Sequence, residues 1–117
     1  MKERLLLAGL LFGSALSTHS VEKRDLSPSC HAIVVENGYM KGGLTVPLLR
    51  GYSVIFMRDT AVWNSRGFWS LDHELAHSQQ ICERGSLKFI KDYFADRVGF
   101  EKNADDRARE KYLKGQK

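Results

Sequence analysis

Two histidines and a glutamate are spaced so that they can bind and use a metal ion. His73 and His77 are four residues apart, so on a helix both imidazoles lie on the same face, one turn apart. Glu74 lies beside this face, where its carboxylate can reach a water on the metal. Two neutral imidazoles suit zinc, which in catalytic sites takes a third protein ligand and a water. The spacing therefore predicts a zinc site in which Glu74 takes a proton from the zinc-bound water and passes it to a leaving group.

An acidic segment near the C-terminus offers a third ligand. Glu101 and Asp105 are four residues apart and would share one helix face. This arrangement suits a glutamate on the metal with an aspartate behind it that orients an imidazole. Asn103 is also a plausible N-cap, and a helix that began there would exclude Glu101 and make Asp106 a rival ligand. Glu83, on the histidine helix, is a second rival.

The two patterns together resemble those of the gluzincin metallopeptidases. His73-Glu74-Leu75-Ala76-His77 matches their HExxH motif, and Glu101-Lys102-Asn103-Ala104-Asp105 matches their ExxxD motif, which is often ExxAD. The resemblance implies a zinc metallopeptidase, a hydrolase with one Zn²⁺ per chain that acts on a peptide or protein substrate. Residue by residue, it implies the ligands His73, His77 and Glu101, the general base Glu74, and Asp105 as the partner of a histidine ligand.

The resemblance extends to the surroundings of the motif. The run HELAHSQQ, with Gln80 three residues after the second histidine, is similar to compact HExxHxxQ zincin-like domains of bacteria. In gluzincins a strand beside the motif helix receives the peptide by edge pairing, and residues 52–57 are the candidate here. No spacing singles out a residue that stabilises the oxyanion. The candidates are Tyr93, Arg107, Arg109 and Tyr112.

Two other functions fit the same residues. One is a non-catalytic zinc-binding domain of the same fold, which serves stability or partner binding. The other is a metal-free interaction module in which the histidine pair is incidental. Glu74 favours the enzyme, because a structural zinc site needs no base and usually has four protein ligands.

Composition indicates one ordinary globular domain. The chain has 117 residues, 43% of them hydrophobic and 27% charged, with a net charge of +4. Its lysines and arginines are scattered rather than clustered in a stripe, so no nucleic-acid partner is expected. The sequence carries no indication of oligomeric state.

The N-terminus has the layout of a secretory signal peptide. A basic start, residues 1–4, precedes an apolar run at 5–12 and small residues at 13–17. The run is too short to span a bilayer, so we expect export, to a bacterial periplasm or the medium, without stable membrane insertion after removal of residues 1–17. An uncleaved anchor or an amphipathic N-terminal helix is the alternative. In an oxidising compartment, Cys30 and Cys82 would form a disulfide.

The elements that position these residues predict an α+β fold over residues 30–117, which the resemblance implies is a small zincin-like domain. Residues 18–29 read as a flexible lead-in. The β-branched run at 31–36 and the Asn37-Gly38 turn predict a hairpin with a return strand at 39–46, and residues 52–57 predict a third strand.

Three helices should follow the strands. Ser70 is the expected N-cap of the first helix, and Gly85 is its expected end. The second should begin near Ser86 and end at Gly99, with an apolar stripe facing the core. Its members are Leu87, Ile90, Phe94 and Val98, widened by Phe89 and Tyr93. The third helix would carry Glu101.

Overall fold

The computed structural model describes residues 18–37 and 42–115. The expected signal peptide, residues 1–17, lies outside the described residues, as does most of the expected turn after Asn37. Among the described residues, no helix is both long and apolar enough to cross a bilayer.

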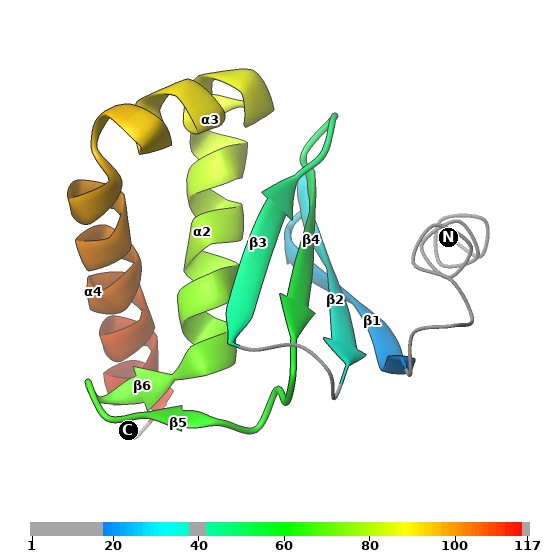
Figure 1. The fold of residues 1–117 in the computed structure, drawn as a ribbon, viewed down its shortest axis with the longest axis vertical. Coiled ribbons are helices and arrows are strands. Elements are labelled where there is room, and N and C mark those ends of the chain that lie inside the picture. The colour runs from blue at the N-terminus through cyan, green and yellow to red at the C-terminus, as the bar shows by residue number, and fades with distance from the viewer. Residues whose placement is uncertain (1–17, 38–41, 116–117) are drawn as a thin grey trace.

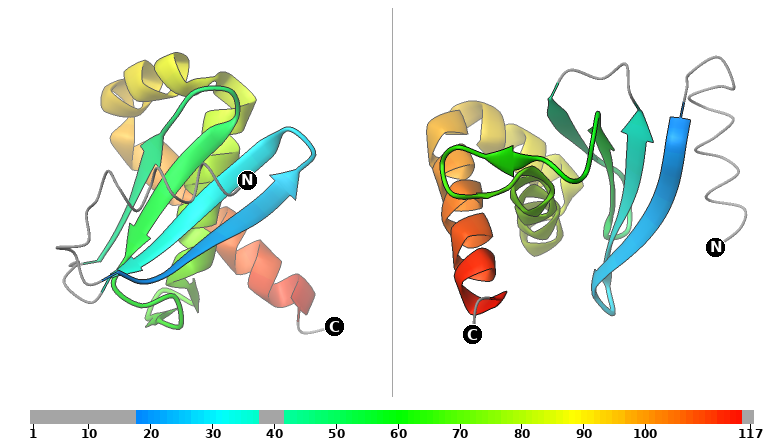
Figure 2. Two further views of the ribbon diagram at one scale, coloured as in Figure 1. Left: turned by 90° about the vertical axis from the view of Figure 1, so that its right-hand side faces the viewer. Right: turned by 90° about the horizontal axis from the view of Figure 1, so that it is seen from below.

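The described residues form an α+β domain, as expected, with a four-stranded sheet followed by three helices. The central helix packs on one face of the sheet, and the last helix packs on the other side of the central helix (Figures 1 and 2). The helices are α2 (Ser70–Arg84), α3 (Ser86–Ala95) and α4 (Arg97–Gly115). The strands are β1 (Thr18–Ser27), β2 (Cys30–Asn37), β3 (Gly43–Pro47) and β4 (Tyr52–Met57), with a small hairpin of β5 (Trp63–Asn64) and β6 (Phe68–Trp69) before α2.

The sheet order β1-β2-β4-β3 corrects two expectations. Residues 18–27 form a strand that pairs antiparallel with β2, and are not a flexible lead-in. The strand expected to return along β2 instead pairs antiparallel with β4, and β4 runs parallel to β2. The reason lies in β2, which is almost entirely buried. A buried strand needs hydrogen-bond partners on both edges, and β1 and β4 supply them.

Two apolar layers flank the sheet, and one of them packs against α2. Ala32, Val34, Ile55 and Met57 face the helix and pack against its Leu71 and Leu75. The opposite face carries Ile33, Val35 and Val54, packed with Val21, Tyr52 and Phe56. Alternate residues of a strand point to opposite faces, so both layers come from the same strands.

The expected disulfide joins Cys30 to Cys82, with a Cα–Cα distance of 5.8 Å. It connects the start of β2 to the last turn of α2. The sheet and the C-terminal end of the histidine helix are therefore linked covalently as well as by packing.

The helix boundaries differ from those expected at three places. Ser70 is the first residue of α2 rather than its N-cap, and no side chain caps that end, whereas Gly85 ends the helix as expected, at φ 88°. The second helix stops at Ala95, and Gly99 lies inside α4. The cause is Asp96, whose Oδ1 accepts a hydrogen bond from the backbone N–H of Gly99 at 3.1 Å. An aspartate at this position caps the helix that follows.

The expectation that the apolar stripe of α3 faces the core is wrong. Leu87 and Phe94 are 79% and 80% exposed, whereas Phe89 is buried and packs edge-on to Phe100, with ring centroids 5.6 Å apart. Tyr93, one turn after Phe89, is half-buried beside it. Apolar residues cover more than one face of α3. Only one face can contact the protein, and the aromatic pair buries more area.

Candidate metal centre

Helices α2 and α4 bring three side chains together at one point. His73 Nε2 lies 3.0 Å from Glu101 Oε1, and His77 Nε2 lies 3.2 Å from His73 Nε2 and 3.2 Å from Glu101 Oε2. Within the described residues, these three form the one group of histidine, cysteine or acidic side chains that can hold a metal ion. The structure therefore brings together the three residues that the sequence singled out as candidate ligands, His73, His77 and Glu101.

The other nitrogen of His77 is held by Gln80. Gln80 Oε1 lies 2.8 Å from His77 Nδ1. The Gln80 amide donates to the backbone carbonyl of Phe100 at 3.0 Å and to Asn103 Oδ1 at 3.0 Å. A backbone carbonyl only accepts, so the Gln80 atom facing Phe100 is nitrogen and the atom facing His77 is oxygen. His77 Nδ1 therefore carries the hydrogen, and its Nε2 presents a lone pair to the cluster.

Asp105 lies behind His73. Its Oδ1 is 2.7 Å from His73 Nδ1, within ion-pair distance, and within the described residues neither buried atom has a well-aligned hydrogen bond to any partner. A carboxylate beside Nδ1 favours the tautomer with the hydrogen on that nitrogen. Phe68, fully buried, stacks on the His73 ring, with centroids 5.6 Å apart. Asp105 therefore lies next to His73, the histidine that the sequence singled out as a candidate ligand.

The electrostatics of the cluster favour a cation. Two imidazole lone pairs and a carboxylate converge at 3.0–3.2 Å, and three acceptors at such distances repel one another unless a proton or a cation lies between them. Ligand atoms about 2.1 Å from a tetrahedral zinc are about 3.4 Å apart. The spacing here is slightly tighter, and the nitrogen and oxygen donors are those zinc prefers. These residues therefore fit a zinc ion with one position left for water.

Tyr93 supports the Glu101 carboxylate. Its hydroxyl donates a hydrogen bond to Glu101 Oε2. Burial opposes ionisation of Glu101, but the Tyr93 hydrogen bond and the neighbouring His77 and His73 outweigh it and lower the pKa of Glu101. Burial, and then the contact with Glu101, raises the pKa of the Tyr93 phenol. Glu101 is thus kept as a carboxylate, the form that binds a metal.

Glu74 lies at the edge of the cluster, beside β3. The Thr45 hydroxyl lies 2.8 Å from Glu74 Oε1 as a hydrogen-bond donor. Gly43 leaves room for the carboxylate, because a Cβ on that residue would come within 2.9 Å of Glu74 Oε2. The edge strand therefore holds the candidate base in place.

These groups line one cleft of about 540 Å³. One wall is β3 with Leu44 and Pro47, and the other is α3 with Ile90 and Phe94. His73, Glu74, His77 and Glu101 form the floor between them. The cleft is open to solvent and has an apolar wall on each side.

The expected edge strand is wrong. Residues 52–57 form β4, which lies between β2 and β3 and has both edges paired. Within the described residues the two edge strands of the sheet are β1 and β3, and β3 is the one whose Thr45 contacts Glu74. The hairpin expectation paired the β3 segment with β2, and so residues 52–57 were wrongly expected to form the edge strand.

Both rival ligands point away from the cluster. Glu83 is bound by Arg107 through two hydrogen bonds of 2.8 Å. Asp106 is exposed and pairs with Lys102 at 3.2 Å and Arg109 at 3.0 Å. The Asn103 alternative also fails, because α4 begins at Arg97 and includes Glu101.

One of the four oxyanion candidates lies in the cleft. Tyr93 lines it, whereas Arg107 is bound to Glu83, Arg109 donates to the backbone carbonyl of Arg66, and Tyr112 packs against a tryptophan.

The sequence did not predict three features of the site. Arg66 and Arg97 line the cleft, and Gln80 contacts His77. Asp96, as an N-cap, is the sequence signal that could have placed Arg97 at the start of α4.

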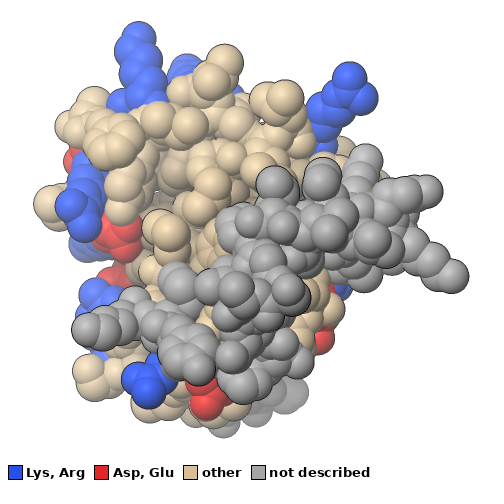
Figure 3. All heavy atoms as spheres, turned by 45° about the vertical axis from the view of Figure 1, so that its right-hand side comes forward, with Lys and Arg blue, Asp and Glu red and all other residues tan. Residues whose placement is uncertain are grey.

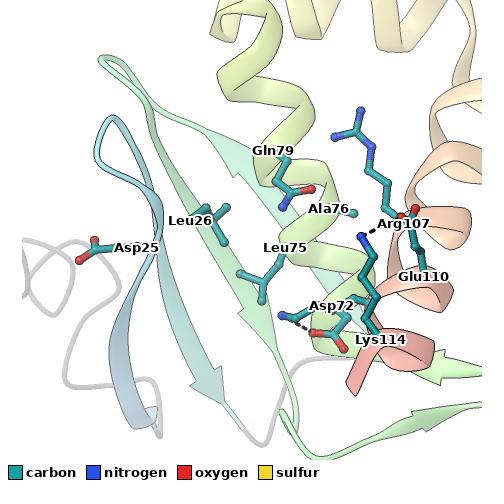
Figure 4. Close-up of a pocket in the computed structure, with 10 residues that line it drawn as sticks. Asp25, Leu26, Asp72, Leu75, Ala76, Gln79, Arg107, Glu110 and Lys114 are labelled. Carbon is teal, nitrogen blue, oxygen red and sulfur yellow. Dashed lines mark ion pairs between the residues drawn. The ribbon is translucent and has the colours of Figure 1, made fainter. Parts of the chain in front are cut away.

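A second cleft, of about 430 Å³, lies between β1, α2 and α4 (Figure 4). Its charged side chains are mostly paired with one another, Lys111 with Asp72 at 2.9 Å and Lys114 with Glu110 at 3.0 Å. No group that can hold a metal is found among its described residues. Among the described residues, the group that could hold a metal ion therefore lies in the first cleft.

Comparisons with protein-family models, with curated proteins and with solved structures find no match.

Proposed function

We propose that this chain is a zinc peptidase that hydrolyses peptide bonds in the cleft between β3 and α3. The observation that carries the proposal is the convergence of the two Nε2 lone pairs and the Glu101 carboxylate. Gln80 and Asp105 hold the two imidazoles with these lone pairs facing inward. Such partners behind metal-binding histidines fix the tautomer and raise the basicity of the ligand.

The chain's own residues supply the rest of the chemistry. A zinc ion bound by this set would polarise a substrate carbonyl and lower the pKa of a water. Glu74, held by Thr45 at 2.8 Å, takes a proton from the attacking water and delivers it to the leaving amine. The free edge of β3 can pair with the backbone of an extended peptide and so bring its carbonyl over the cluster. Arg66 and Arg97 also line the cleft and carry positive charge.

Metal content tests the binding half of the proposal. Elemental mass spectrometry of the purified chain is expected to find about one zinc per chain. His73→Ala should abolish binding and Glu101→Ala should weaken it. Glu83→Ala and Asp106→Ala are the matched controls, because both carboxylates pair with basic side chains away from the cluster. No zinc in protein never exposed to chelator would overturn the proposal.

Glu74→Gln tests the catalytic half. The amide keeps the size of the side chain and its contact with Thr45 but cannot take a proton. We expect the zinc content of the wild type with hydrolysis of a quenched-fluorescent peptide library reduced by at least about a hundredfold. Wild-type hydrolysis in this variant would contradict the assigned base. Zinc binding without hydrolysis of any peptide by the wild type would favour the non-catalytic zinc domain.

A further inference from the structure

Helix α3 and the turn between β3 and β4 expose a line of apolar side chains. Leu87 and Phe94 are 79% and 80% exposed, and Leu49 in the turn is 73% exposed. Leu87, Ile90 and Phe94 follow helical spacing and share one face of α3. The Ser86 hydroxyl donates to the backbone carbonyl of Leu48, which joins the turn to the start of α3. We call these four residues, Leu49, Leu87, Ile90 and Phe94, the α3 apolar surface.

Basic side chains lie along one side of this surface and in the adjoining turn. Lys88 and Lys91 are exposed on α3, and Arg50 is exposed in the turn. Within the described residues none of the three forms an ion pair with an acidic side chain. The one acidic residue of α3, Asp92, is neutralised by Arg84 at 2.8 Å. Figure 3 shows the upper part of the molecule as largely uncharged, with Lys and Arg at its margin.

The combination of charge and apolar area indicates the partner. A large exposed apolar patch marks an interaction surface. A helix with apolar side chains flanked by lysines lies in the interface of an anionic bilayer, because the lysine stems extend along the apolar region while the ammonium groups reach the headgroups. A symmetric dimer through α3 would instead place the same patch of each copy against the other and bring Lys88 and Lys91 of both copies together.

We propose that the α3 apolar surface binds peripherally to anionic lipid bilayers. Leu87 and Phe94 enter the interfacial region, and Lys88, Lys91 and Arg50 contact the anionic headgroups. Ile90 and Phe94 also line the cleft of the candidate metal centre, so binding places the mouth of that cleft next to the bilayer. The proposal does not depend on zinc or on hydrolysis.

Vesicle flotation tests it. The purified chain is mixed with vesicles of phosphatidylcholine alone or of phosphatidylcholine and phosphatidylglycerol in equal amounts, with and without chelator. All variants share one N-terminus, verified by mass spectrometry, so that the N-terminal segment contributes equally. We expect binding to the anionic vesicles, weaker binding to the neutral ones, and no effect of chelator. Equal binding to both compositions, or none to the anionic one, would overturn the proposal.

Two sets of variants test the residues. Leu87→Ser with Phe94→Ser is expected to lower the partition coefficient by at least about tenfold. Lys88→Gln with Lys91→Gln is expected to lower it about 30-fold, since each lysine near an anionic surface contributes about 1 kcal/mol. Leu113→Ser is the matched control, because Leu113 is apolar and 62% exposed but lies in the last turns of α4.

The variants also distinguish a lipid bilayer from the other candidate occupant of the surface, a second copy of this chain. All substituted side chains are exposed, so thermal unfolding should match the wild type. Light scattering measures oligomeric state over a range of concentrations. The membrane proposal would be overturned if the wild type is a dimer that does not float with anionic vesicles and the Leu87/Phe94 variant is a monomer. That result would identify a second copy as the occupant of the surface. Equal flotation of the Leu113 and Leu87/Phe94 variants would also overturn it.

Discussion

Asp105→Asn is expected to weaken zinc binding without unfolding the chain. Asp105 Oδ1 lies 2.7 Å from His73 Nδ1, and its Oδ2 lies 3.4 Å from an Arg66 guanidinium nitrogen. Asparagine has the same shape but one oxygen and one NH₂ group. Because Arg66 only donates, the asparagine oxygen will turn toward it and leave the NH₂ group facing His73. That group donates to Nδ1 and forces the ring hydrogen onto Nε2, where the lone pair for the metal is lost.

The magnitude follows from the role of this contact. Loss of a polar partner behind a metal-binding histidine typically costs 10–100-fold in metal affinity, or about 1.4–2.7 kcal/mol. We expect Asp105→Asn to fall in this range. His77, held independently by Gln80, and Glu101 still bind, so the loss is partial rather than complete.

A competition titration against a chromogenic zinc chelator measures the affinity. Asp106→Asn is the matched control, because it is the next residue, makes the same chemical change and is exposed in salt bridges with Lys102 and Arg109. Thermal unfolding of the zinc-free variants confirms that both remain folded. Wild-type affinity in Asp105→Asn, or an equal loss in Asp106→Asn, would refute the tautomer reasoning.

Three further predictions test the fold and the cleft. Replacing both Cys30 and Cys82 with serine should lower the free energy of unfolding by about 4 kcal/mol on the chain-entropy model, since the disulfide spans a sequence separation of 52; an unchanged urea midpoint would contradict this. Hydrogen bonds from Arg107 lower the pKa of Glu83, so the pair's stabilisation is present above the ordinary carboxyl pKa and is lost as the pH falls through the lowered value. Arg107→Met should therefore make the free energy of unfolding depend less on pH between about pH 5 and pH 3. Unfolding midpoints over this range measure it, and a pH dependence equal to that of the wild type would count against the prediction. Gly43→Ala should reduce hydrolysis with zinc retained, because the added Cβ would displace the carboxylate of the candidate base; parallel activity and zinc assays check this, and unaltered hydrolysis would show that the carboxylate tolerates the shift.

Features set by local spacing could be predicted from the sequence. His73 and His77 share a helix face because four residues make about one turn, and the same holds for Glu101 and Asp105. Gly85 ends α2 because its positive φ suits glycine. These outcomes depend on backbone geometry within a few residues, which the sequence encodes directly.

Strand neighbours could not be predicted in this way. Asn37-Gly38 is a strong hairpin signal, but a turn signal does not specify which strand receives the chain. That choice depends on β2, whose two buried faces and two edges need partners from distant segments. The identity of the edge strand beside Glu74 depends on the same choice.

The sequence by itself singled out the residues that we propose bind zinc, and the tertiary structure decided how they are held and what surrounds them. Gln80 orients His77 only because α4 brings the carbonyl of Phe100 to its amide, from 20 residues away. The buried face of α3 was likewise set by packing, since Phe89 found Phe100 across the helix interface and left Leu87 and Phe94 in solvent. Helical periodicity defines the faces of a helix, but only the partner that packs against it selects the face that is buried.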